Sequence, residues 1–293
     1  VLDREKLNLI ATKQYSDNSI EREAQAAADL LSACISVGRK PSVETLLHNV
    51  ISSQFVVHLH PTVINGLTSS VDVEAQTVRL FGSSVLYVPY SDPGYPLYKS
   101  VAAAVEGYVA EHGCEPKAIM LQNHGVFVGG QTIEQIEAVY TELLSAIDSA
   151  ITMPLPEGEV PQCEFISEVV PAIRMIASQG DEIKTLRVTN NPLVEWFAQD
   201  EDHFAKVAKP FSPDSIIYCR SKYIYISAST KEEILDQAER KISDYISQNG
   251  YAPKIVVIKG LGLVSIGENA KDCANTEDVY LDMMKVSYLA QSF

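Results

Sequence analysis

The sequence has few cysteines and no long apolar run, and each shortage excludes a class of protein. Its five cysteines are odd in number, widely spread and form no CxxC pair, so they indicate neither a disulfide framework nor a cysteine zinc site. No stretch approaches the roughly 18 apolar residues of a membrane span, and the N-terminus shows no basic region followed by an apolar one. We therefore expect a cytoplasmic protein without a signal peptide or membrane association.

Positive charge is also scarce. Lys and Arg number 23 against 38 Asp and Glu, which gives a formal net charge of -15. A phosphate backbone or an anionic membrane surface would have to bind against the field of the whole molecule, so nucleic acid and membranes are not expected partners. A small anionic substrate is still compatible with this charge, because a metal ion or local dipoles can reverse the potential inside one pocket.

Two further features are missing. The chain does not begin with Met, which suggests that it starts partway along a natural protein. No GxGxxG motif follows an expected strand, so we predict no dinucleotide-binding dehydrogenase domain. With 293 residues, 46% of them hydrophobic, the chain is nevertheless long enough to form about two domains.

Two stretches of the chain repeat each other. YVAEHGCEPKAIMLQNHGVFVGG, from Tyr108, matches YISQNGYAPKIVVIKGLGLVSIG, from Tyr245, without gaps. Strand and helix patterns alternate around both stretches, which indicates the α/β class. Glycines and a proline at equal offsets indicate the same turns, so we predict two copies of one unit: residues 1–152 and 163–293, joined by the Pro-rich linker 153–162.

Histidines are concentrated in the first copy, which holds five of the six. In the apolar stretch FVVHLH, strand alternation puts His58 and His60 on one face, roughly 7 Å apart at the backbone. Two imidazoles at that spacing can converge on one ion, at about 2.0 to 2.1 Å from each nitrogen. The alternative is structural: both rings half-buried, with backbone carbonyls as their hydrogen-bond partners.

A third histidine completes the protein part of a catalytic zinc site. His124 is the candidate, because it lies in an expected turn beside Gly125, where backbone can approach closely. The second copy has GLG at residues 260–262 where the first has NHG at 123–125, so the fold itself does not require His124.

A carboxylate is expected near these histidines. Glu44 lies in the first turn of a short predicted helix capped by Ser42, and this helix leads almost directly into the histidine strand. Glu44 is therefore a candidate general base or fourth ligand. The alternative is that its charge only stabilises the helix dipole.

Taken together, four motifs resemble the class II aldolase/adducin family, which contains the fuculose-phosphate and rhamnulose-phosphate aldolases. They are PSVET, VVHLHP, VPYSDPG and LQNHGVFVGG, in family order across roughly residues 40 to 150. The resemblance implies an α/β fold (α+β layered) of two tandem aldolase-like units. Each has a central, mainly antiparallel sheet flanked by helices, and the second unit is degenerate and structural.

The resemblance also implies roles for individual residues. Zn²⁺, or another divalent transition metal, is bound by His58, His60 and His124. The catalytic residues are Glu44, as the base, and Tyr90, which donates a proton to the aldehyde oxygen from a neighbouring subunit of a homo-oligomer. The implied substrate-binding residues are Ser42, Asn123 and Gly125. For Tyr90 the alternative is a residue that ends a strand before a Pro-Gly turn.

The implied reaction is retro-aldol cleavage of a phosphorylated ketose, of the rhamnulose or fuculose 1-phosphate type, through a zinc-stabilised enediolate. The chain departs from the family pattern because Val43 replaces one of two phosphate-binding serines and the N-terminal phosphate loops are missing. The tandem arrangement is similar to the aldolase part of bifunctional rhamnulose-phosphate aldolase/alcohol dehydrogenase proteins.

Two alternatives to the aldolase are open. The first is a metal-dependent epimerase, dehydratase or decarboxylase of a sugar phosphate or sugar acid, because relatives use the same three histidines. Glu rather than Asp at position 44 favours the aldolases over the epimerase. The second is a non-catalytic, adducin-like interaction module. The presence of Glu44 and all three histidines argues against this for the first copy.

Overall fold

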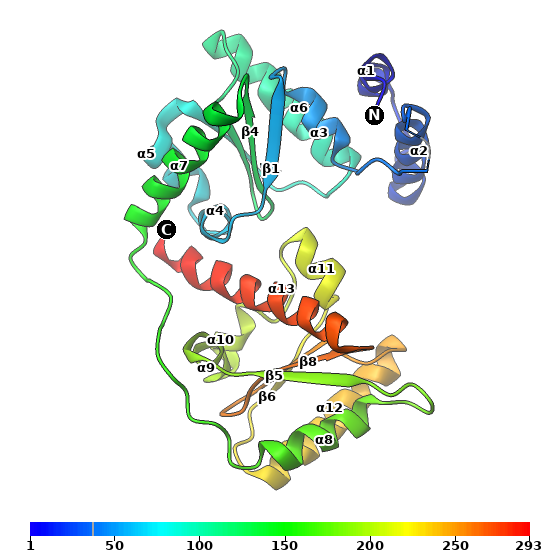
Figure 1. Cartoon of the computed structure of the whole chain (residues 1–293), viewed down its shortest axis with the longest axis vertical. Helices are drawn as coiled ribbons and strands as arrows, with labels where there is room; N and C mark the ends of the chain where they lie inside the picture. Colours follow the sequence, from blue (N-terminus) through cyan, green and yellow to red (C-terminus); the bar gives the residue numbers. More distant parts are fainter. Residues whose placement is uncertain (37) are drawn as a thin grey trace. The chain divides into compact units, whose positions relative to one another are not determined.

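The computed structural model describes residues 1–36 and 38–293, which form two compact units. One unit is Val1–Ala150 together with Phe293, and the other is Ile151–Ser292. Each contains its own four-stranded sheet with helices packed on both faces (Figure 1). The expected α/β class with two sheet-containing units is thus confirmed. Within the described residues, no helix combines the length and apolarity needed to cross a bilayer.

The first unit has its strands in the order β1-β4-β3-β2. The β1–β4 and β3–β4 pairs are antiparallel and the β2–β3 pair is parallel. Its strands are β1 (Phe55–Leu59), β2 (Val85–Val88), β3 (Ala118–Leu121) and β4 (Gly125–Gly130). Its helices are α1 (Arg4–Thr12), α2 (Ser19–Ser32), α3 (Thr45–Val50), α4 (Thr62–Thr68), α5 (Val73–Phe81), η1 (Gly82–Ser84), α6 (Tyr95–His112) and α7 (Ile133–Ala150).

Strand alternation divides the core of the first unit between the two faces of the sheet. On one face, Phe127 and Ile119 pack with buried residues of α1, α2, α3 and α6. On the other face, Val126 and Val128 pack with residues of α4 and α7. The central strand β3 is buried along its whole length, as a strand covered on both faces must be. The sheet is therefore a rigid platform on which the short α3 and the end of β1 are fixed.

The second unit repeats this arrangement, with the strand order β5-β8-β7-β6 and the same pattern of parallel and antiparallel pairs. Its strands are β5 (Thr185–Thr189), β6 (Ile224–Ile226), β7 (Ile255–Ile258) and β8 (Gly262–Gly267). Its helices are α8 (Ile166–Ala177), α9 (Pro192–Ala198), α10 (Glu201–Ala205), α11 (Pro213–Cys219), α12 (Lys231–Asn249), α13 (Ala270–Leu289) and η2 (Ala290–Ser292).

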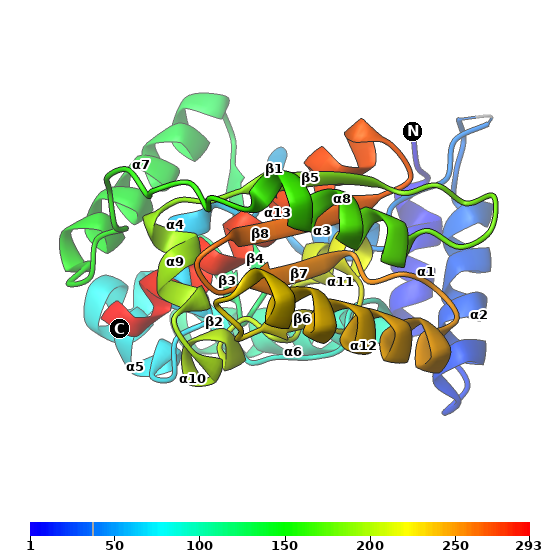
Figure 2. The same cartoon turned by 90° about the horizontal axis from the view of Figure 1, so that it is seen from below.

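Two helix layers cover the second sheet. α8 and α12 lie side by side on one face (Figure 2), where Val256 and Ile258 of β7 join their core. α9 and α13 cover the other face, together with Ile255 and Val257 of the same strand. The segment between α7 and α8, residues 151–165, contains no helix or strand, and the Pro-rich linker was predicted within it.

Candidate metal centre

The end of β1 positions the first two histidines. His58 and His60 lie on the same side of the chain because they are two residues apart, and His58 pairs with Phe127 across the β1–β4 ladder. Their ring centroids are 4.7 Å apart. The two Nε2 atoms face each other at 2.9 Å. The structure thus brings these two predicted ligands together.

The β3–β4 turn brings His124 to the same point. Asn123 has a φ of 57°, in the left-handed region that Asn tolerates better than most residues, and the His124 N–H donates to the Leu121 carbonyl. The His124 ring centroid lies 5.2 Å from that of His58 and 5.1 Å from that of His60. His124 is 5% exposed, so the turn buries a polar ring against two others. The role that Asn123 has in this structure is to shape the turn.

Gly125 allows the two segments to approach each other. A Cβ atom built on Gly125 would lie 2.5 Å from Cδ2 of His60, 2.6 Å from the Leu59 carbonyl oxygen and 3.2 Å from Cε1 of His58. Real Cβ atoms do not come this close to backbone, so a side chain here would force β1 away from β4. Gly125, predicted to contact substrate, lies directly against both histidines.

The fourth group comes from the start of α3, and here one expectation was wrong. The helix begins at Thr45 with Glu44 as its N-cap, not at a Ser42 cap. Ser42 is exposed, and its Oγ accepts a hydrogen bond from the Glu44 N–H at 3.2 Å, which fixes the turn before the helix. Oε1 of Glu44 lies 2.9 Å from Nε2 of His124 and 3.5 Å from Nε2 of His58.

These four groups fit a divalent transition metal. One ligand atom from each of Glu44, His58, His60 and His124 lies within 4.8 Å of the other three. Nδ1 of His58 is 3.1 Å from the Val126 carbonyl oxygen, which can only accept, so the neutral His58 ring carries its proton on Nδ1. Its Nε2 lone pair then faces another imidazole nitrogen and a carboxylate. A shared cation satisfies all of these electron pairs at once.

The donor set indicates which metals suit the site. Three imidazoles and one carboxylate are ligands for zinc, and manganese, cobalt and iron also accept them. The site is closed on the histidine side, where the His58 and His124 side chains are 6% and 7% exposed, and more open at Glu44, at 29%. The hydrogen bond with His124, followed by the nearby His58 ring, holds the pKa of Glu44 well below its usual range, although burial opposes this shift. Glu44 is therefore ionised.

Phe127 supports the centre and was missed from the sequence. Its ring stacks on His58 with centroids 3.9 Å apart and an interplanar angle of 9°. His48 of α3 packs its edge against Phe127 at 5.2 Å, and burial, followed by the neighbouring His58, lowers its pKa. The signal was available, because residues paired in an antiparallel ladder share a face, but it requires knowing that β1 pairs with β4.

Tyr90 is not part of this cluster. It is 57% exposed, its N–H donates to Oε1 of Gln122, and its hydroxyl donates to Asp92 at 3.3 Å. Partial burial and then Asp92 raise its pKa, so the hydroxyl keeps its proton. Among the contacts of the described residues, none joins Tyr90 to the four groups. It precedes the Pro-Gly turn that leads into α6, as its structural alternative predicts.

The second unit has no such cluster at the corresponding positions. Val188 pairs with the third residue of β8, as His58 pairs with the third residue of β4. Two residues further on, Asn190 takes the place of His60. Leu261 precedes β8 as His124 precedes β4. Neither valine nor leucine can bind a metal ion.

Comparisons with known proteins agree with the motifs in the first unit. Residues 4–148 match the family model for the class II aldolase and adducin N-terminal domain. An uncharacterized oxidoreductase, YuxG of Bacillus subtilis (strain 168), is 23% identical over 279 residues. This match covers 82% of this chain and 39% of the relative, so the chain spans about two fifths of that protein's length.

A solved structure that is similar is the N-terminal class II aldolase domain of a conserved protein from Thermoplasma acidophilum. It has 23% sequence identity and a TM-score of 0.41, with 50% of this chain and 64% of that chain covered. The family assignment rests on the sequence model, whose matched region contains Glu44 and all three clustered histidines. Residues 4–148 of this chain belong to the class II aldolase/adducin family.

Proposed function

We propose that the first unit is a metal-dependent lyase that cleaves a phosphorylated ketose by a retro-aldol reaction. The observation that supports this most is the convergence of three imidazole nitrogens and one ionised carboxylate within 4.8 Å. In the proposed site His58, His60 and His124 hold a divalent metal such as zinc. When bound, the metal supplies positive charge for the negative charge that develops on the ketone and adjacent hydroxyl oxygens.

The residues of the chain then have separate tasks. In the reaction a proton leaves the C4 hydroxyl, the C3–C4 bond breaks, and a proton is returned to C3, giving a shorter ketose phosphate and an aldehyde. Glu44 is ionised and borders the open side of the cluster, so in cleavage it takes up the proton released from the C4 hydroxyl and delivers a proton to C3. The three histidines are mostly shielded from water, which strengthens electrostatic effects on bound substrate.

Tyr90 is the proposed acid for the aldehyde oxygen in the reverse, aldol-forming direction, and in cleavage its hydroxyl passes on the proton that leaves the C4 hydroxyl. Its hydroxyl is protonated and exposed, and lies outside the cluster of its own chain. It can serve a site only if a second copy places it there, so this role requires a homo-oligomer. Ser42, Asn123 and Gly125 remain proposed substrate contacts. We propose that the second unit is structural at the equivalent position, where ligands are replaced by Val188 and Leu261.

The test is product analysis with full-length, metal-loaded protein and a panel of ketose 1-phosphates and sugar acids. We expect a ketose phosphate to yield two products whose carbon atoms add up to those of the substrate. A single product with all carbons retained would instead indicate an epimerase or dehydratase, and release of CO2 a decarboxylase. Conversion of no substrate by protein with full metal content would contradict all of these enzymes.

A further inference from the structure

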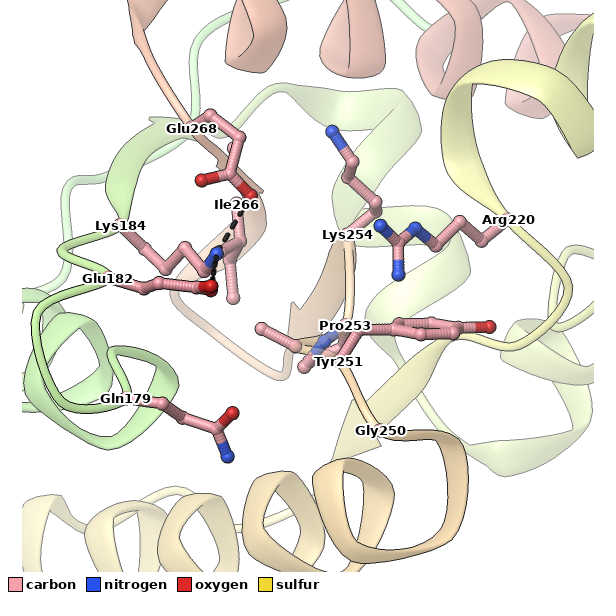
Figure 3. A pocket seen from close by; sticks show the side chains of 12 residues that line it. Gln179, Glu182, Lys184, Arg220, Gly250, Tyr251, Pro253, Lys254, Ile266 and Glu268 are labelled. Atoms are coloured by element: carbon pink, nitrogen blue, oxygen red, sulfur yellow. Dashed lines mark hydrogen bonds and ion pairs between the residues drawn. The ribbon is translucent and has the colours of Figure 1, made fainter.

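The second unit contains a polar cavity at the end of its sheet opposite to the positions that match the histidine cluster. It has a volume of about 280 Å³ and is formed by the segments before β5 and β7, after β8 and after α11 (Figure 3). Three basic side chains line it: Lys184, Arg220 and Lys254. Its volume suits a small metabolite and is too small for a dinucleotide.

Two of these basic groups are already neutralised. Nζ of Lys184 lies 2.7 Å from Glu268 and 3.2 Å from Glu182. Nζ of Lys254 lies 2.5 Å from Oδ2 of Asp272. Positive charge for a ligand must therefore come mainly from the third group.

Arg220 is that group. Across residues 1–36 and 38–293, no ion pair or hydrogen bond of its guanidinium is found. The guanidinium lies 3.7 Å above the centre of the Tyr251 ring and extends toward Lys254 at the edge of the cavity (Figure 3). Stacking of this kind uses the flat face of the guanidinium and leaves its N–H groups available for a planar or tetrahedral oxyanion.

The backbone of Arg220 is strained. It follows α11 with φ 65° and ψ -164°, a conformation that is essentially restricted to glycine. At the same place in the first unit, directly after α5, stands Gly82, with φ 58° and ψ -138°. Glycine adopts this backbone conformation without strain. The second unit therefore has an arginine at a position where its side chain makes the backbone conformation unfavourable.

The other cavity residues are also specific to the second unit. Lys184 directly precedes β5, whereas Gln54 directly precedes β1. Tyr251 follows the glycine that ends α12, whereas Cys114 follows the glycine that ends α6. The cation, its stacking partner and the buried lysine thus occur together in one unit and are all missing from the other.

We propose that this cavity binds a small hydroxylated anion, through a phosphate or carboxylate group. Arg220 holds two oxygens of the anion through paired N–H groups. Glu182 and Glu268, which are largely exposed at the rim, accept hydrogen bonds from hydroxyl groups of the ligand. The proposal does not depend on the reaction proposed for the first unit.

The test is isothermal titration of the full-length chain with inorganic phosphate, glycerol 1-phosphate and glycerate. Arg220→Gly restores the residue that the first unit uses at this corner, so we expect the variant to unfold at the same temperature as the parent or higher. We expect it to bind the probes at least about tenfold more weakly. Lys222→Ala is the matched control: it removes one positive charge from an exposed residue two positions away, and binding should be unchanged.

The titrations also separate this cavity from the metal centre. They are repeated on His124→Ala in the presence of a chelator, and binding should persist. Whichever of glycerol 1-phosphate and glycerate binds with higher affinity shows whether the cavity prefers a phosphate or a carboxylate group. Either probe should bind more tightly than inorganic phosphate, and equal binding would overturn the role of Glu182 and Glu268. Binding by Arg220→Gly equal to that of the parent, loss of binding in His124→Ala, or no binding of any probe would overturn the site.

Discussion

The two units of this chain have the same strand order but concentrate polar chemistry at opposite ends of their sheets. In the first unit the histidine cluster lies where β1 ends and β4 begins. In the second unit that end carries Val188 and Leu261, while Lys184 and Arg220 line a cavity at the other end. The sheet is therefore a scaffold that tolerates a site at either end and requires neither.

The buried positions show this most clearly. Leu261 is 1% exposed and packs into the core of the second unit, at the place where the first unit buries His124. A leucine needs no partner there, whereas a buried imidazole must be hydrogen bonded or bind a metal. The second unit thus shows how the fold packs this point without a histidine. Matched substitutions in both units can test that difference.

The largest expected effect is loss of the metal. His58→Ala together with His60→Ala removes two of the three histidine ligands, so we expect the content of divalent metal to fall from about one per chain to nearly none. Elemental analysis after dialysis measures this. The control carries Val188→Ala and Asn190→Ala at the corresponding positions and should keep its metal. Equal metal content in the histidine variant and the parent would exclude this site.

The second expected effect distinguishes the role of Glu44 as a base from the role of the histidines as metal ligands. Glu44→Gln keeps the size of the side chain but cannot accept a proton, so kcat should fall by about 10² to 10⁴-fold while most of the metal is retained. Steady-state kinetics on the substrate found by product analysis, with metal content measured in parallel, gives the answer. A variant with unchanged kcat would show that another group moves the proton.

Much of this comparison could be predicted from the sequence, because it rests on local patterns. The repeat at Tyr108 and Tyr245 identified two units with the same turns, and the alternation in FVVHLH put His58 and His60 on one face. Both predictions hold in the structure, because spaced glycines and strand periodicity are properties of short segments.

Other features depend on contacts distant in sequence and were not predictable from local patterns alone. Phe127 stacks on His58 only because β1 pairs with β4, although β2 and β3 lie between them in the sequence. The start of α3 was misplaced by about two residues because Ser42, an excellent cap in sequence terms, bonds the Glu44 N–H in the turn before the helix. Arg220 gave no signal at all, since its residue type disfavours the backbone conformation that it adopts.

The third expected effect follows from replacing the glycine that begins β4, Gly125, or the glycine that begins β8, Gly262. Gly125→Ala places a methyl group 2.6 Å from the Leu59 carbonyl oxygen and 2.5 Å from the His60 ring. Because backbone must move, we expect destabilisation of about 1–3 kcal/mol and weaker metal binding. Gly262→Ala meets the Thr189 carbonyl oxygen at the same 2.6 Å and also has a φ of +119°. It should cost at least as much stability and leave metal affinity unchanged.

Denaturant unfolding and metal titration of these two variants test the assignment. If Gly262→Ala lowers metal affinity as much as Gly125→Ala does, the cause is a general loss of structure. The contact between Gly125 and the histidines then has no specific role in metal binding. If neither variant is destabilised, the strands do not approach these two glycines as closely as this structure indicates.

The smallest expected effect is a difference in stability between variants of two lysines that occupy equivalent positions in the two units. Lys117 and Lys254 each follow a proline just before the third strand of their sheet, but their ion pairs differ in exposure. Lys117 lies 3.3 Å from Glu142 with both side chains more than half exposed, so Lys117→Met should change the free energy of unfolding by less than about 0.5 kcal/mol. The Lys254 side chain is 14% exposed and lies against Asp272, so Lys254→Met should cost about 1.5 to 3 kcal/mol.

Urea unfolding of both lysine variants, with fluorescence as the probe, measures this difference. High salt should weaken the effect at Lys117 further and leave most of the effect at Lys254, because a shielded pair is screened less than an exposed one. Equal, small effects in both variants would mean that the Lys254–Asp272 pair does not stabilise the second unit, and Lys254 would then be held in the cavity wall for its charge rather than for stability.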